Sequence, residues 1–114
     1  MTNKIGLTFL LAWFAVMAIV ANYSYDRNVP YRGNTGDEYA FKMCRLDIAY
    51  QPDVQNAPVV VWFHGGGLTG GSREIPSGLL TDGMVVVGVE YRLSPHVKTM
   101  EIVDDAAAAV AWVF

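Results

Sequence analysis

The apolar positions of the second half of the chain predict two buried strands and one helix. Residues 59–63 and 84–89 are continuous apolar runs rich in β-branched side chains, a pattern typical of parallel strands covered on both faces. Residues 102–114 place apolar side chains three and four positions apart, as in an amphipathic helix. The predicted inner face of this helix consists of Val103, Ala106, Ala107, Val110, Val113 and Phe114. Two such strands joined by a helical crossover indicate an α/β sheet.

Earlier in the chain the pattern is weaker. Residues 42–50 alternate, which predicts a half-exposed strand at the start of the sheet. Its buried face would hold Cys44, Leu46, Ile48 and Tyr50. Residues 22–41 have no sustained period, and we expect an irregular lead-in whose tyrosines pack on the domain.

The first 21 residues have the pattern of a targeting segment. One positive charge at Lys4 precedes the apolar residues 5–21, which end in small side chains, as signal peptides do. As a helix this run would be roughly 25 Å long, against a hydrocarbon core of about 30 Å. We therefore predict a cleaved signal peptide, or alternatively an N-terminal membrane anchor, and in either case an exported domain.

Composition narrows the class of protein. A length of 114 residues fits one modest domain, and 53% hydrophobic residues suffice for a core. The net charge of −3 comes without a basic cluster, which argues against a nucleic-acid partner. Cys44 is the single cysteine, so neither an intrachain disulfide nor a cysteine metal cluster can form, and we expect a buried core thiol there.

A histidine and three glycines, His64 to Gly67, follow the first buried strand directly. Such a loop can bind negative charge through its amides. Gly65, Gly67 and Gly70 also fit the dinucleotide fingerprint G-x-G-x-x-G, with Glu90 about twenty residues on. Against that hypothesis, Pro76 and Gly78 interrupt the helix that the fingerprint requires. A phosphate loop is excluded because Gly71 stands where its lysine is needed.

An oxyanion hole is the third interpretation of this loop. The loop at residues 64–67, the sequence Tyr-Arg-Leu-Ser-Pro at residues 91–95, and two aspartates followed by alanines at residues 104–109 occur in one order. Together they resemble the N-terminal part of an α/β-hydrolase, most of all the hormone-sensitive-lipase-like and feruloyl-esterase-like carboxylesterases, over residues 42–114.

The resemblance implies a serine-dependent carboxylic ester hydrolase that needs no metal or organic cofactor. It also implies that the amides of Gly66 and Gly67 face the substrate oxyanion, while His64 and Gly65 shape the loop. The substrate would be a small-molecule or polysaccharide-linked ester.

The catalytic triad of such an enzyme is absent from these 114 residues, because no serine stands in the frame G-x-S-x-G. Nothing in the spacing supports a triad of Ser72, His96 and Asp104. We therefore expect a fragment that is inactive alone, from a longer enzyme. The alternatives are a non-catalytic binding module of the same fold and, third, a dinucleotide-binding oxidoreductase.

Several other side chains have structural expectations. Trp62 and Trp112 are expected in the core, and His96 in an exposed loop. Arg92 and Asp105 could brace the loop as an ion pair or be solvated separately.

Overall fold

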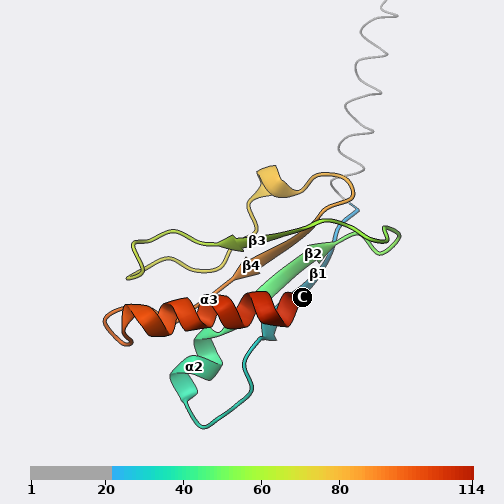
Figure 1. The fold of residues 1–114 in the computed structure, drawn as a ribbon. Helices are drawn as coiled ribbons and strands as arrows, with labels where there is room; N and C mark the ends of the chain where they lie inside the picture. The colour runs from blue at the N-terminus through green and yellow to red at the C-terminus, as the bar shows by residue number, and fades with distance from the viewer. Residues whose placement is uncertain (1–21) are drawn as a thin grey trace, which may run out of the picture.

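The structure, a computed structural model, describes residues 22–114. They form a four-stranded mixed sheet in the order β1-β2-β4-β3, with one long helix across a face of the sheet (Figure 1). The strands are β1 (Ser24–Pro30), β2 (Arg45–Tyr50), β3 (Val59–Phe63) and β4 (Val85–Val89). The helices are α2 (Glu38–Met43), the short 3-10 turn η1 (Ser77–Leu79) and α3 (Thr99–Val113).

The predicted signal or anchor at residues 1–21 lies outside the described residues. Among residues 22–114, none of the helices has the length and apolar character that crossing a membrane requires.

Both predicted strands exist, but only β4 is buried as expected, because no residue of β3 is fully buried and its Trp62 is 36% exposed. β3 and β4 run parallel, in register from Val59 opposite Val85 to Phe63 opposite Val89. The expected helical crossover between them is wrong, because the connection is extended apart from η1. It passes directly over β4: a Cβ atom on Gly88 would lie 2.2 Å from the carbonyl oxygen of Glu74. Glycine in the middle of β4 is therefore what admits this connection.

The strand expected at residues 42–50 begins only at Arg45, because the preceding residues belong to α2. β2 pairs antiparallel with both β1 and β4. Asp47 and Ala49 are buried on the face that we expected to be exposed. The half-exposed interpretation is wrong, since β2 has buried side chains on both faces, with Leu46 on one and Asp47 and Ala49 on the other.

The irregular lead-in predicted for residues 22–41 is also wrong. β1 is a mostly exposed edge strand that forms by pairing with β2, and its register shifts between Asp26 and Val29. α2 begins after Asp37, whose side chain accepts a hydrogen bond from the backbone N–H of Ala40 at 2.9 Å. The expected packing of tyrosines is confirmed for buried Tyr31, whose hydroxyl donates to the carbonyl of Glu90 at 2.6 Å, whereas Tyr25 is 40% exposed.

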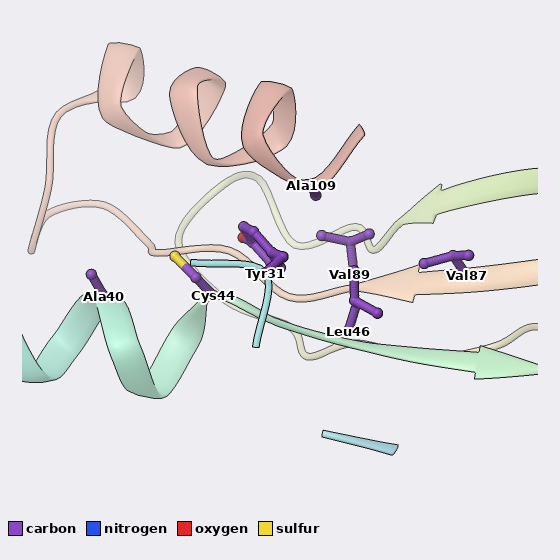
Figure 2. Packing of buried hydrophobic residues seen from close by; sticks show 7 residues of the cluster. All are labelled: Tyr31, Ala40, Cys44, Leu46, Val87, Val89 and Ala109. Atoms are coloured by element: carbon purple, nitrogen blue, oxygen red, sulfur yellow. The ribbon is translucent and has the colours of Figure 1, made fainter. Parts of the chain in front are cut away.

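The core lies between α3, α2 and one face of the sheet. Figure 2 shows Ala109 of α3 pointing at Val89 and Leu46, with Tyr31 and Cys44 beside them. Cys44 has no exposed surface, as predicted, and burial raises the pKa of its thiol.

The helix predicted at residues 102–114 exists, but it begins at Thr99 and is rotated from the expected orientation. Its buried residues are Ile102, Asp105 and Ala109. On the predicted inner face, Val103 and Phe114 are 51% and 81% exposed. The rotation follows from Asp105, a charged residue that is fully buried against arginine and therefore turns toward the sheet.

The two tryptophans expected in the core are on the surface. Trp62 is 36% exposed because β3 is an edge strand within residues 22–114, and Trp112 is 45% exposed near the C-terminal end of α3.

Candidate functional site

The glycine loop leaves β3 at its carboxyl end, where the backbone turns sharply out of the sheet. Gly66 has a φ of 132° and Gly67 a φ of 64°, values that glycine adopts without a steric penalty. Leu68 follows with a φ of 63°, an uncommon conformation for a residue with a side chain. Its conformation is stabilised by neighbouring backbone, since its carbonyl accepts from the N–H of Ser94 at 2.8 Å.

Carbonyl and amide groups of this loop differ in their hydrogen bonding. The Gly66 carbonyl accepts from the N–H groups of Thr69 and Gly70, both at 3.2 Å. Within residues 22–114, the N–H groups of Gly66 and Gly67 donate to no protein acceptor, and both residues are exposed. The loop is therefore fixed through its carbonyls while these two amides can reach another molecule.

Gly70 and Gly71, the next pair of glycines along the chain, pack tightly against the loop. A Cβ atom on Gly66 would lie 2.2 Å from the Gly70 carbonyl oxygen, and one on Gly71 would lie 2.2 Å from the Gly65 carbonyl oxygen. Gly71 has a φ of 87°, and its Cβ would also lie 2.6 Å from Nδ1 of His64. From the sequence, Gly71 served only to exclude a phosphate loop, which needs a lysine at that position. A second pair of glycines so close to the first could have indicated this backbone contact.

His64 is buried under the loop, with 4% of its surface exposed. Its ring stacks on Tyr91 with centroids 4.4 Å apart and planes 5° apart, and the Tyr91 hydroxyl donates to the His64 carbonyl. Nδ1 lies 2.8 Å from the Gly65 carbonyl oxygen, and because a carbonyl can only accept, Nδ1 bears the proton in this contact. These contacts agree with a loop anchor, as expected from the sequence.

The hydroxyl of Tyr91, the residue stacked on His64, stays protonated. Burial first, and then the negative charge of Glu90, raise the pKa of Tyr91. Nε2 of His64 is buried and, in the part of the chain that the structure describes, has no hydrogen-bond partner.

Arg92 and Asp105 form a buried ion pair, so the bracing alternative is confirmed and the solvated one is wrong. Nε and Nη2 of Arg92 each donate to the Asp105 carboxylate at 2.8 Å, and its backbone N–H donates at 3.1 Å. Arg32 adds a third guanidinium contact at 3.1 Å. The pair joins the end of β4 to α3 and so fixes the segment that contains Tyr91.

Glu90, the acidic residue of the dinucleotide hypothesis, is bound to another side chain. Arg73 donates to its carboxylate through Nη1 at 2.8 Å and through its backbone N–H at 3.3 Å. After Gly70 the described chain continues without a helix until η1. The geometry therefore lacks both the free acid and the helix N-terminus that a dinucleotide site uses.

Ser72, His96 and Asp104 do not form a triad. All three residues are exposed, as was predicted for His96, and no hydrogen bond joins any two of them in residues 22–114. His96 instead lies against Tyr39, with ring centroids 5.0 Å apart. Across residues 22–114, no group of three or more histidine, cysteine or acidic side chains is placed to hold a metal ion.

An apolar hollow of about 280 Å³ opens beside the loop. It lies between the loop and the first turns of α3. Its lining consists of Phe63, His64, Leu68, Tyr91, Ile102, Val103 and Ala106.

Comparison with known proteins finds esterases among the proteins that are similar to this chain. Residues 46–114, more than half of the chain, match the BD-FAE family. Esterase LipI of Mycobacterium tuberculosis is 40% identical over 67 residues, which are 54% of this chain and 21% of that protein. The chain thus spans about a fifth of the length of this curated relative.

Solved structures of esterases share the fold. Esterase B from Lactobacillus rhamnosis superposes with a TM-score of 0.65 at 24% identity, covering 96% of this chain and 37% of that one. A truncated carbohydrate esterase from gut microbiota superposes with a TM-score of 0.61 at 23% identity, covering 81% of this chain and 33% of that one. The predicted fold, the N-terminal portion of an α/β-hydrolase, is confirmed.

Proposed function

The chain belongs to the BD-FAE family, and from this premise we propose that the complete protein is a serine-dependent carboxylic ester hydrolase. In this proposal the loop at residues 64–67 is its oxyanion hole. The esterase names of the relative and of the structural neighbours support the reaction class. The catalytic serine, acid and histidine would come from sequence outside this chain.

This proposal rests most directly on the backbone N–H groups of Gly66 and Gly67, which are exposed and donate to no acceptor within residues 22–114. Both follow a parallel strand at its carboxyl end, where α/β sheets bind their ligands. Because the loop carbonyls and His64 are already bonded, the amides are held in place before any substrate arrives. Such preorganisation is what makes oxyanion stabilisation effective.

The chemistry assigned to this chain is charge stabilisation. When a serine hydroxyl attacks the ester carbonyl, its carbon–oxygen double bond opens and the oxygen becomes negative. The N–H groups of Gly66 and Gly67 would donate to that oxygen until it collapses and expels the alcohol. One such donor lowers the activation barrier by roughly 2.7 to 4 kcal/mol in comparable enzymes.

The hollow beside the loop supports an ester with an apolar part. Phe63, Leu68 and Ile102 offer hydrocarbon surface, which suits a short acyl or alcohol group rather than a charged one. A small-molecule ester and a polysaccharide-linked ester both remain within this class.

Covalent labelling tests the reaction class. The complete protein is incubated with an alkyl phosphonate ester that bears a good leaving group, and its intact mass is measured. We expect one phosphonyl adduct, on a serine in a G-x-S-x-G frame beyond residue 114. A folded protein that gives no adduct, or a sequence with that serine replaced, would instead favour the non-catalytic binding module.

A further inference from the structure

Arg73 lies outside the glycine loop, yet it ties the loop to the sheet. We propose that Arg73 is a positioning residue for the oxyanion hole, held by Asp47 and Glu90. This inference rests on the proposed function, because it concerns the same loop. Arg73 touches neither of the two amides, and its effect would come through the backbone of residues 70–73.

Arg73 is bound on three sides by the sheet. Its Nε donates to Asp47 of β2 at 2.9 Å, and its Nη1 donates to Glu90 at the end of β4 at 2.8 Å. Its Nη2 donates to the side-chain oxygen of Asn28 in β1 at 3.2 Å. One guanidinium thus joins three strands or strand ends, as its planar fork of donors allows.

The carboxylates need this partner because they are largely buried. The side chains of Asp47 and Glu90 are 11% and 12% exposed, and that of Arg73 is 22% exposed. Asp47 has one further cation, Arg27, at 3.6 Å, but the Arg27 side chain is 62% exposed. An ion pair shielded from water in this way is far less screened than a surface pair, so Arg73 is held firmly.

From Arg73 the connection to the loop is short. Gly71, two residues earlier, packs its Cα against the Gly65 carbonyl oxygen and Nδ1 of His64 so closely that no Cβ atom fits. Gly70 donates to the Gly66 carbonyl at 3.2 Å. Residues 70 and 71 therefore pack directly against residues 65 and 66. Arg73, two residues further along, anchors this backbone segment to the sheet.

A loop that is held less firmly should lose stabilisation of the transition state while still binding substrate. Displacements of about 1 Å at a catalytic group can lower a rate by up to about a hundredfold. We expect Arg73→Met to lower kcat by about ten- to a hundredfold with KM changed less than about threefold. A trifluoromethyl ketone, which forms the oxyanion, should lose affinity by the same factor as kcat/KM.

Two variants keep this test independent of simple misfolding. Arg73→Lys retains a charge but cannot reach all three partners, so its kcat should lie between those of the wild type and Arg73→Met. Arg32→Met removes an arginine that is likewise paired with a buried carboxylate, Asp105, but that has no contact with residues 64–73. It should lower the melting temperature and leave the affinity for the ketone within about twofold.

The experiment measures kcat, KM and ketone affinity of the complete protein and these variants, together with hydrogen exchange of the Thr69 and Gly70 amides, which donate to the Gly66 carbonyl. Faster exchange in Arg73→Met but not in Arg32→Met, with the expected kinetic split, supports the proposal. An active wild type whose folded Arg73 variants keep kcat and exchange, or lose kcat and KM together, overturns it. If the wild type itself is inert, the proposed function fails, and the exchange measurement still decides whether Arg73 fixes the loop.

Discussion

At the scale of single residues, the glycines of the site differ in what they require. Gly66 and Gly71 have positive φ and no space for a Cβ atom, whereas Gly65 and Gly67 have nothing within 4 Å of that position. The sequence predicted the loop and its four residues, but not this difference. The contact depends on the return of residues 70 and 71 over the loop, which no local pattern contains.

Replacing Gly71 should therefore destabilise the protein. Gly71→Ala forces a methyl group against the Gly65 carbonyl and the His64 ring, and we expect a loss of about 1–3 kcal/mol in unfolding free energy. Gly78→Ala is the matched control, because nothing lies within 4 Å of its Cβ position. Denaturant melts of both variants decide the point, and equal stabilities would contradict the packing described for Gly71.

Asp105 should make stability depend on pH. Burial alone would raise the pKa of its carboxyl, but the hydrogen bonds and charge of Arg92, with the charge of Arg32, hold that pKa below its usual value. Because the pKa of Asp105 is lower in the folded than in the unfolded state, its contribution to the free energy of unfolding is complete above the unfolded pKa of about 4. This contribution is lost as pH falls through the folded pKa.

Asp105→Asn should cost about 3 kcal/mol or more at pH 7, since it leaves the Arg92 guanidinium without its carboxylate. The difference from the wild type should shrink below about pH 4. Exposed Asp104→Asn serves as the control. Urea melts between pH 3 and pH 7 measure the difference, and a gap that stays constant with pH would contradict a lowered pKa for Asp105 in the folded state.

At the scale of elements, the apolar runs predicted where β3 and β4 lie, and the pattern failed for elements that form by pairing with other strands. β3 was located to the residue, and β4 to within one residue. β1 was missed because an exposed edge strand has little apolar signal, and it forms only through its ladder with β2. α2 was missed because it has six residues, although Asp37 before Glu38 is a recognisable helix start.

The outer side of α3 should make the isolated chain self-associate. Val103, Val110 and Phe114 share one side of the helix at spacings of seven and four residues and are 51%, 39% and 81% exposed, and contiguous apolar surface of this kind favours association. Over residues 22–114, β3 also pairs with β4 along one edge only, and its other edge has backbone groups that could pair with a second chain.

Light scattering of residues 22–114 should show oligomers, and Val103→Lys with Val110→Glu should shift the population toward monomer. Adding one charge at exposed Ser77, as Ser77→Glu, should not. A monomeric, cooperatively melting wild-type chain would contradict the expectation.

At the scale of the whole molecule, the chain corresponds to the first part of a larger fold. It covers 37% of esterase B, and its sheet ends at β3 within the described residues. The sequence predicted this fold through three short motifs, because one of them forms the loop and the other two supply Arg92 and Asp105 of the buried pair. It could not predict the rotation of α3, which depends on where that pair lies in the assembled core.

Export is a prediction for the whole protein. The charge at Lys4 and the apolar residues 5–21 should direct secretion, and cleavage should follow a small residue. N-terminal sequencing of the protein from the producing cell measures this. A mature chain that begins within residues 18–23 supports a signal peptide, an intact N-terminus in the membrane fraction supports the anchor, and an intact chain in the cytoplasm contradicts both.

The central claim is that the loop at residues 64–67 stabilises the oxyanion of an ester hydrolysis. The most direct measurement is the steady-state rate of the complete protein on a chromogenic butyrate ester, for the wild type, Gly66→Ala and Gly78→Ala. We predict hydrolysis by the wild type and Gly78→Ala, and a kcat up to about a hundredfold lower for folded Gly66→Ala, because its methyl group would meet the Gly70 carbonyl and displace the amide of residue 66. A folded wild type without hydrolysis, or a folded Gly66→Ala variant with unchanged kcat, would contradict the claim.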